Sequence, residues 1–234
     1  MDHNLNELVS RLVSTQPDNV ISVIVYGSAV ATSGNAKKSD YQTLIITRRL
    51  AAEDLRRIRP VAQWWRGQGY SLPVFFTEAE FQDSLDVFPI EFRHMKRAYR
   101  VLHGKDLLAN CEVSKTNLRL ETEYELRGKL LRLRTLSIPA GESAEDLTKL
   151  MAESVVSFVR FMRPILDLLG EEPPLDRAAT AIQVGHRLKV KTEPIVRVLR
   201  LREESRSLME AEAQDLFSSY LNCLTEVIAA VDKL

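Results

Sequence analysis

The sequence predicts an α+β protein, in which a sheet with flanking helices is followed by an all-α helical bundle. Two observations support this fold class. In the first half of the chain, short β-branched runs alternate with stretches whose apolar residues recur at helical spacing. From about Asn117 onwards, only the helical spacing recurs. We therefore expect an α/β domain over residues 1–110 and a helical bundle domain over residues 111–234.

Strands are expected where apolar and β-branched residues form short runs. In the first half these runs cover residues 20–26, 43–47, 72–77 and 87–92. Helices with one apolar face are expected over residues 5–13, 51–66 and 78–84, the second of them interrupted near Pro60.

In the second half, the same helical criterion predicts five helices. They cover residues 120–136, 147–169, 176–187, 192–209 and 211–231. Ser143 is the expected N-cap before the second of these helices. The apolar faces of the second and the last helix are expected to pack against each other as parts of one bundle.

The composition indicates an ordinary globular protein of a reducing compartment. Lysine plus arginine and aspartate plus glutamate both number 32, so no net charge attracts the chain to nucleic acid or to an anionic membrane. Cys111 and Cys223 lie far apart, and neither they nor the four histidines have the spacing of a metal site. Residues 1–14 do not have the pattern of a signal peptide, and no apolar run is long enough to span a membrane. We therefore expect a cytoplasmic protein without membrane or nucleic-acid partners.

The most informative segment is a turn and a loop that join two predicted strands. Gly27 follows a buried run and allows a sharp turn that brings the backbone close to a ligand. Ser28 adds a hydroxyl and a backbone N–H that suit a phosphate oxygen. Asp40 opens the next strand, where alternation directs residues 40 and 42 to the same face. Two carboxylates at such positions would hold two divalent cations over a triphosphate, and a third acid on a neighbouring strand would complete the site.

This order of elements resembles the nucleotidyltransferases of the DNA-polymerase-β-like superfamily. Their hallmark is a Gly-Ser dipeptide after a buried strand, followed by Ser-Asp-x-Asp at the entry to another strand. Gly27, Ser28, Ser39 and Asp40 match this pattern, and Gln42 occupies the place of the second aspartate.

Two further segments carry the resemblance beyond the motif. Residues 88–107 and 118–134 are similar to bacterial nucleotidyltransferase-like proteins with a helical C-terminal domain, a layout that also resembles the aminoglycoside nucleotidyltransferases. The resemblance implies that the sheet is a nucleotidyltransferase-like mixed sheet with flanking helices. It also implies that the ligand is a nucleoside triphosphate with Mg²⁺.

The resemblance assigns roles to individual residues. Asp40 and Glu91 would be the catalytic residues and the metal ligands, with Glu91, in the last predicted strand, as the third acid and a candidate base. Gly27, Ser28 and Ser39 would bind the nucleotide. In a purely structural interpretation, the Gly-Ser dipeptide is an ordinary turn, Asp40 caps a strand and Glu91 is an outward-facing acid.

Basic and aromatic side chains offer further candidates. Lys129 belongs to a basic stripe on the helix 120–136 and would bind the triphosphate; the alternative is a solvated helix face on which the basic residues pair with Glu123 and Glu125. Trp64 and Trp65 are candidates for stacking a base, although packing of an amphipathic helix explains at least one of them.

Gln42 leaves two functions open. Glutamine is neutral and offers one carbonyl oxygen, so its presence leaves two magnesium ions poorly compensated. The first hypothesis is a transferase that binds a nucleoside triphosphate and moves its nucleoside monophosphate to a hydroxyl acceptor, either a small molecule or a protein. The alternative is a catalytically silent relative with a degenerate active site, acting as a nucleotide-binding or protein-interaction module. A homodimer is compatible with either function.

Overall fold

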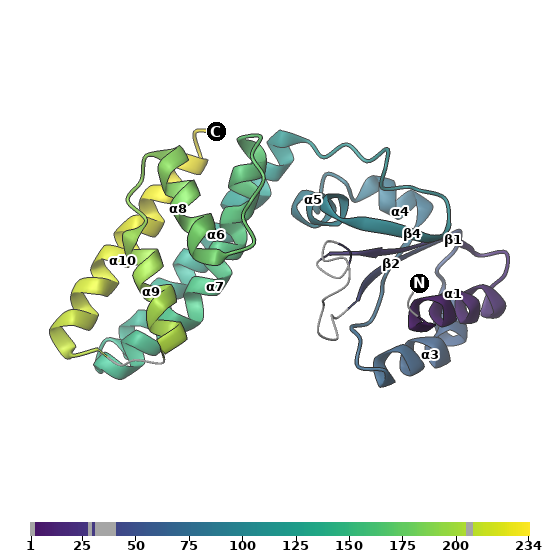
Figure 1. Ribbon diagram of the computed structural model, residues 1–234, viewed down its shortest axis with the longest axis horizontal. Coiled ribbons are helices and arrows are strands. Elements are labelled where there is room, and N and C mark those ends of the chain that lie inside the picture. The colour runs from purple at the N-terminus through teal and green to yellow at the C-terminus, as the bar shows by residue number, and fades with distance from the viewer. Residues whose placement is uncertain (1–2, 28–29, 31–40, 205–207) are drawn as a thin grey trace. The chain divides into compact units, whose positions relative to one another are not determined.

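The computed structural model describes residues 3–27, 30, 41–204 and 208–234. Ser28, Ser39 and Asp40 therefore lie outside the described residues. The chain forms two compact units, Met1–Ser114 and Lys115–Leu234 (Figure 1). The first unit combines a sheet with helices, and the described part of the second unit contains helices without strands.

A four-stranded mixed sheet forms the centre of the first unit. Its strands are β1 (Val20–Tyr26), β2 (Gln42–Thr47), β3 (Val74–Thr77) and β4 (Tyr99–Gly104). Their order is β3-β2-β1-β4, with β1 antiparallel to β2 and β4, and with β2 parallel to β3. The predicted α+β class is confirmed, and the predicted strands over residues 20–26, 43–47 and 72–77 correspond to β1, β2 and β3.

Helices cover both faces of the sheet (Figure 1). These are α1 (His3–Thr15) and α3 (Ala52–Gly67) on one face, and α4 (Glu78–Asp83) and α5 (Pro89–Arg97) on the other. The alternation of β1 explains the two layers, because successive side chains of a strand point to opposite faces. Val23 and Val25 pack with α1 and α3, while Ile24 and Tyr26 pack with α4 and α5.

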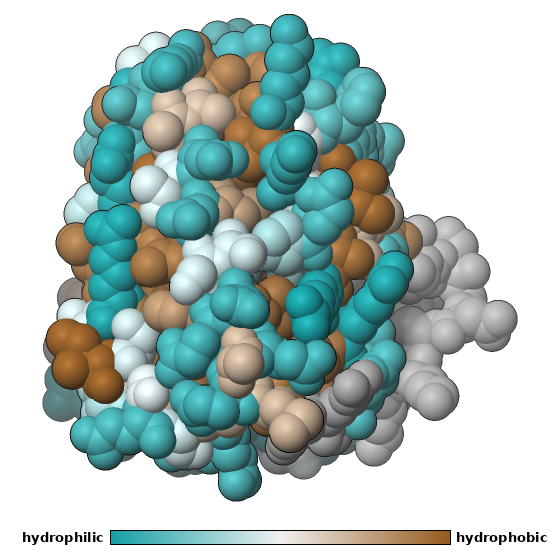
Figure 2. Space-filling view, turned by 90° about the vertical axis from the view of Figure 1, so that its left-hand side faces the viewer, coloured by the Kyte–Doolittle hydropathy of each residue, from teal (hydrophilic) through white to brown (hydrophobic). Residues whose placement is uncertain are grey.

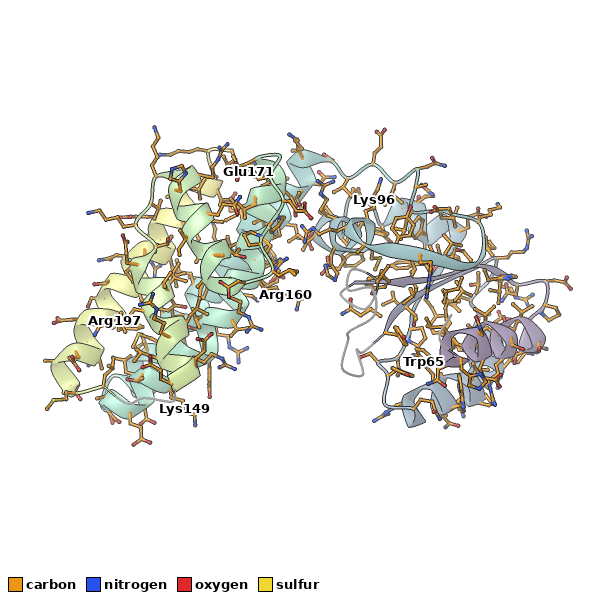
Figure 3. The ribbon with its side chains drawn as sticks, viewed as in Figure 1. Trp65, Lys96, Lys149, Arg160, Glu171 and Arg197 are labelled. Carbon is orange, nitrogen blue, oxygen red and sulfur yellow. The ribbon has the colours of Figure 1, made fainter. Side chains whose placement is uncertain are left out.

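Trp65 anchors the layer formed by α1 and α3, and its side chain is fully buried (Figure 3). Its ring stacks on Tyr70 with a centroid distance of 4.3 Å, and its Nε1–H donates to the carbonyl oxygen of Ser71 at 2.9 Å. The guanidinium of Arg11 lies 4.5 Å from the ring centroid of Trp64. Packing within the first unit therefore accounts for both tryptophans.

Residues 87–92 do not form the predicted strand. Pro89 instead begins α5, where the fixed φ of proline suits the first turn of a helix and its missing N–H costs nothing. Phe92 and Met95 then bury one face of α5 against the sheet. The prediction was wrong because a short apolar run does not distinguish a strand from a helical turn. The fourth strand is β4, an edge strand whose mixed polar and apolar sequence falls outside the criterion for a buried run.

Two predicted helix features also differ from the structure. α3 continues through Pro60, because this proline lies on the exposed side of the helix, where the carbonyl that loses its partner faces water. α9 (Glu193–Glu204) ends before residue 209, and Leu208 and Met209 are not helical. Met209 is instead the N-cap of α10 (Glu210–Val231), and its extended backbone, with a ψ of 159°, is not helical.

The described helices of the second unit share one apolar core. They are α6 (Lys115–Ala140), α7 (Ala144–Leu168), α8 (Arg177–Leu188), α9 and α10 (Glu210–Val231). Ser143 caps α7 by accepting the backbone N–H of Asp146 at 3.3 Å, as the sequence predicts. The predicted packing of α7 against α10 is confirmed, since the rings of Phe158 and Tyr220 meet edge to face at 6.2 Å and the Tyr220 hydroxyl lies 3.1 Å from that of Ser154.

The surface carries both polar and apolar side chains. Figure 2 shows a face on which polar side chains surround small apolar areas. Scattered apolar side chains of this kind are ordinary on protein surfaces. Within the described ranges, no helix combines the length and the hydropathy that a membrane crossing requires.

The end of β4 requires a glycine. Gly104 has a φ of +76°, and a Cβ added there would lie 1.9 Å from the carbonyl oxygen of Ile21. We expect Gly104→Ala to lower the free energy of unfolding by about 2–4 kcal/mol, because backbone strain and a collision with β1 add together. Urea unfolding followed by tryptophan fluorescence measures this loss in the first unit, which holds both tryptophans.

Gly69→Ala is the matched control for Gly104→Ala. Gly69 also has a positive φ, +88°, but a Cβ at this position would meet no atom within 4 Å. Backbone strain alone should cost about 1 kcal/mol there. If both variants lost the same free energy of unfolding, a close approach of β4 to β1 at Gly104 would be contradicted.

A buried carboxylate fixes the start of α3. Asp54 accepts hydrogen bonds from Nε and Nη2 of Arg49 at 3.0 and 3.1 Å and from the backbone N–H of Ala51 at 2.9 Å. These bonds, those of the Arg49 guanidinium first, hold the pKa of Asp54 below its ordinary value of 3.8. The native state therefore binds this proton more weakly than the unfolded state does, and the carboxylate stabilises the fold above the unfolded pKa.

We expect Asp54→Asn to be less stable than the wild type at neutral pH. The difference should shrink as the pH falls from about 4 through the lowered pKa of Asp54, because the wild-type carboxyl then becomes protonated as well. Urea unfolding at neutral and acidic pH measures the difference, and Asp86→Asn, at an exposed site, serves as the control. If the difference in the free energy of unfolding between Asp54→Asn and the wild type did not change with pH, the charge of Asp54 would not contribute to stability.

Candidate functional site

The turn after β1 depends on Gly27. This residue has a φ of +86°, its N–H donates to the carbonyl oxygen of Ala98 at 2.9 Å, and its own carbonyl oxygen accepts the N–H of Val30 at 3.0 Å. A Cβ at this position would lie 2.8 Å from Oε1 of Gln42. The turn therefore needs glycine for its conformation, and a larger residue would also displace the side chain of Gln42.

Gln42 is the first residue of β2 and lies opposite Tyr26 in the β1–β2 register. Strand alternation places it on the same face as Leu44 and Ile46, which is the face that α5 covers. Asp40 precedes Gln42 by two residues and belongs to the undescribed segment, as do Ser28 and Ser39. Their expected roles stay predictions.

His94 lies beside Gln42. Its Nε2 is 3.2 Å from Oε1 of Gln42, a distance at which a protonated Nε2 donates a hydrogen bond to the amide oxygen. The imidazole also meets the ring of Tyr26 edge to face, with 6.1 Å between the centroids. The sequence interpretation missed this neighbour because it placed residues 87–92 in a strand. A helix beginning at Pro89 would have put His94 one turn after Glu91.

Glu91 occupies the first turn of α5 and not a strand, so its predicted position as an acid on the sheet is corrected. Its side chain is exposed. The pKa of Tyr26 lies above its ordinary value of 10.0, chiefly because the phenol is buried and secondly because of the negative charge of Glu91. Glu91 is therefore electrostatically coupled to the end of β1, close to the Gly27 turn.

The described donors do not fit a pair of magnesium ions. Gln42 offers a neutral amide whose oxygen faces His94. β3, the parallel neighbour of β2, consists of Val-Phe-Phe-Thr and supplies no third acid. Across the described part of the chain, no three His, Cys, Asp or Glu side chains gather in a way that would hold a metal. A pair of hard divalent cations prefers several carboxylate oxygens, which this edge of the sheet does not present in its described portion.

Lys129, the predicted nucleotide ligand on α6, makes its contacts within the second unit. Its Nζ lies 3.0 Å from a carboxylate oxygen of Glu125 and 4.5 Å from the ring centroid of Phe161. Arg127 likewise pairs with Glu123 at 2.6 Å. These pairs correspond to the solvated-face alternative for the basic stripe, and nucleotide binding by Lys129 stays a prediction.

Removing the charge of Glu91 should be visible at Tyr26. We expect Glu91→Gln to lower the pKa of Tyr26, while burial keeps it above 10.0. Phenolate absorbance titration measures the change, with Tyr26→Phe to assign the transition. Asp83→Asn, which removes an exposed acid of α4, is the control. If Tyr26 had the same pKa in Glu91→Gln and in the wild type, the charge of Glu91 would have no effect at the end of β1.

Comparison with known proteins supports the fold. No family model matches the chain, and no curated protein matches its sequence. The chain is similar in structure to the spectinomycin adenyltransferase AAD(9) from Enterococcus faecialis, whose crystal structure contains ATP and spectinomycin. The match covers 97% of this chain and 99% of that chain, with a TM-score of 0.54 and 13% sequence identity. The chain thus has a nucleotidyltransferase-like fold, a mixed sheet with flanking helices followed by a helical region.

Proposed function

We propose that this protein binds a nucleoside triphosphate at the turn after β1 and is a catalytically silent relative of the nucleotidyltransferases. The observation that carries the proposal is the position of Gln42. It opens β2 on the face covered by α5, where the motif calls for a carboxylate, and its amide oxygen faces His94. We also propose that the two compact units are separate domains and that the protein is cytoplasmic, in agreement with the free thiols of Cys111 and Cys223.

Nucleotide binding rests on the turn. Gly27 allows the backbone to come close to a ligand at the end of β1, and its φ of +86° would be strained in a residue with a side chain. Ser28 and Ser39 match the phosphate-binding positions of the motif. Phosphate oxygens accept hydrogen bonds from such hydroxyl and backbone N–H groups without a metal. Binding can therefore persist where the acid set is incomplete.

Charge balance argues against transfer. Magnesium, when bound, would neutralise the triphosphate and polarise the reacting phosphoryl group. The motif gives Asp40 as one candidate metal ligand, and its position on α5 gives Glu91 as the other. Glu91 lies on a helix and not on a strand of the sheet. The neutral amide of Gln42 adds no charge to compensate a second cation. The protein would thus keep the nucleotide-binding turn and lack the paired carboxylates.

Transfer of a nucleoside monophosphate to a hydroxyl acceptor is the second candidate function. The likeness to the spectinomycin adenyltransferase favours it, because that likeness extends over nearly the whole chain and includes the helical region. The acceptor would be a small molecule or a protein with an exposed hydroxyl. Under this candidate, Asp40 and Glu91 would be the metal ligands, and Lys129 would contact the nucleotide.

Restoring the carboxylate tests the proposal. We expect the wild type to bind a nucleoside triphosphate with an affinity that magnesium changes by less than about threefold. Gln42→Asp should make binding at least about tenfold tighter with magnesium than without, or ~1.4 kcal/mol, because the new charge would restore the second carboxylate of the motif. Asp40→Ala in the Gln42→Asp background should abolish this gain. Calorimetric titration of all three proteins, with and without magnesium, gives the affinities.

Gln68→Asp is the matched control, since it adds the same charge at an exposed site of the first unit. It should leave the magnesium dependence of the wild type unchanged. Strong magnesium-dependent binding by the wild type, with pyrophosphate release when hydroxyl acceptors are supplied, would establish the transferase instead. If none of the variants bound a triphosphate, the likeness would be one of fold alone.

A further inference from the structure

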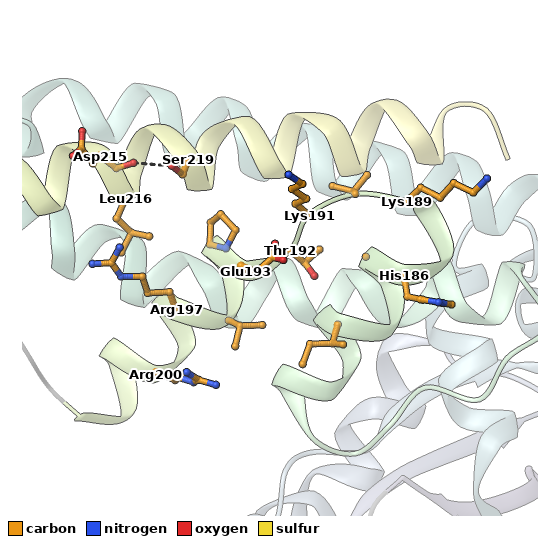
Figure 4. Close-up of a pocket in the computed structure, with 15 residues that line it drawn as sticks. His186, Lys189, Lys191, Thr192, Glu193, Arg197, Arg200, Asp215, Leu216 and Ser219 are labelled. Atoms are coloured by element: carbon orange, nitrogen blue, oxygen red, sulfur yellow. Dashed lines mark hydrogen bonds between the residues drawn. The ribbon is translucent and has the colours of Figure 1, made fainter.

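A large cavity lies within the second unit. It has a volume of about 880 Å³ and is formed by α8, the segment between α8 and α9, α9 and α10 (Figure 4). Sites for small molecules have volumes of this order. All of its lining residues come from the second unit, so it is separate from the turn at Gly27.

A tight turn between α8 and α9 shapes the cavity. Lys189 is the C-cap of α8, and its backbone is left-handed with a φ of 58°, which residues other than glycine rarely adopt. A Cβ at Gly185 would lie 2.4 Å from Oγ1 of Thr192 and 2.7 Å from the carbonyl oxygen of Val190. The chain after α8 therefore folds back onto Gly185, a residue that is costly inside a helix. The close approach explains why glycine stands there.

Positive charge surrounds the cavity. Its lining includes the basic side chains of His186, Lys189, Lys191, Arg197 and Arg200. Figure 4 draws His186 and Lys189 toward one end and Arg197 and Arg200 toward the other. The lysines and arginines of this set form no ion pair with any described residue, and they outnumber the two acids of the lining, Glu193 and Asp215. Unpaired cations of this kind attract an anion.

The hydroxyl of Thr192 is available to a ligand in the cavity. Thr192 lines the cavity, and its side chain makes no hydrogen bond to any residue that the structure describes; its hydroxyl is not among the buried polar atoms that lack a partner, so solvent reaches it. A ligand in the cavity can therefore use this accessible hydroxyl as a hydrogen-bond donor. Thr192 directly precedes α9, whose N-terminal end carries the positive end of the helix dipole.

The remaining walls are aliphatic. The apolar side chains that line the cavity are those of Ile182, Val190, Pro194, Val196 and Leu216. None of the described residues that line it is Phe, Tyr or Trp, so this part of the lining offers no aromatic surface on which a nucleobase would stack. Aliphatic walls with a cationic rim suit a ligand with an apolar body and an anionic head.

We propose that this cavity is a binding site for a small organic anion with an aliphatic body and a phosphate or carboxylate head. The head is held by Lys191 or by Arg197, which Figure 4 draws in different parts of the cavity, with the hydroxyl of Thr192 as a further donor, and the body lies against the aliphatic walls. This site is independent of the proposed nucleotide site, because its binding residues all belong to α8, α9, α10 and their connection. Its occupancy is therefore measurable whether or not a triphosphate binds.

Titration with simple probes tests the site. Hexyl phosphate and hexanoate carry the two head groups on the same chain, inorganic phosphate has no apolar body, and hexanol has no charge. We expect the wild type to bind at least one hexyl anion about tenfold or more tightly than inorganic phosphate and hexanol, as seen by calorimetry and by shifts in amide NMR signals of residues 185–200. The better of the two anions identifies the preferred head group.

Variants locate the binding. Lys191→Gln with Arg197→Gln should weaken binding of the hexyl anion by about tenfold or more, and Thr192→Val, which keeps the shape of the side chain, by about threefold. Lys149→Gln, on α7 and outside the cavity, is the matched control and should bind like the wild type (Figure 3). Circular dichroism melting checks that each variant folds.

Several results would overturn the proposal. Binding of neither hexyl anion at millimolar concentration would remove the site. If hexanol bound as tightly as the hexyl anions, the cavity would bind apolar chains without recognising an anion. If inorganic phosphate bound as tightly, the aliphatic walls would contribute nothing. If the folded Lys191→Gln, Arg197→Gln variant bound the hexyl anion like the wild type, the anion would bind elsewhere.

Discussion

The pairing of Tyr26 with Gln42 is the constraint on which the candidate nucleotide site depends. β1 and β2 are buried on both faces, and a slip of one residue would exchange the side chains that face α1 and α3 with those that face α4 and α5. The register is therefore fixed by the packing of the whole sheet. As a result, Gln42 opens β2 beside the Gly27 turn and on the side of α5.

Within this frame, Gln42 is part of a local arrangement of side chains. Its amide oxygen lies against both the turn glycine and the imidazole of His94. A carboxylate one methylene shorter would stand farther from that imidazole and would bring a charge to the same face. The amide thus suits the neighbours that the structure places around it, which supports the proposal that position 42 does not bind a metal ion.

The sequence was most informative where pattern and packing agree. β1 and β2 are runs of β-branched residues between buried layers, and α7 and α10 have long apolar faces that meet in one core. Residues 87–92 were misassigned because Pro89 and its apolar neighbours suit either a strand or the first turn of a helix. β4 was missed because an edge strand is partly exposed and has no continuous apolar run.

In the candidate site too, some residues are given by local sequence pattern and others only by packing. Gly27 and Gln42 are recognisable from local sequence, since a turn glycine and the first residue of a strand depend on their immediate neighbours. His94 is 52 residues away from Gln42, and its place becomes evident only once α5 is known to be a helix that covers the sheet. Pairs that are distant in sequence depend on how helices and strands pack together, and a single sequence carries no local signal for them.

The two candidate sites differ in what determines their shape. The site at Gly27 brings together strands, a turn and α5, so its geometry depends on the whole first unit. The cavity of the second unit is built from α8 to α10, and the contact between Gly185 and Thr192 shapes it locally. A ligand stabilises the unit that binds it by mass action, and an influence on the other site would require that the ligand bind differently to two states of the protein. Coupling between the two proposed sites would therefore appear as a change in the affinity of one ligand when the other ligand is bound.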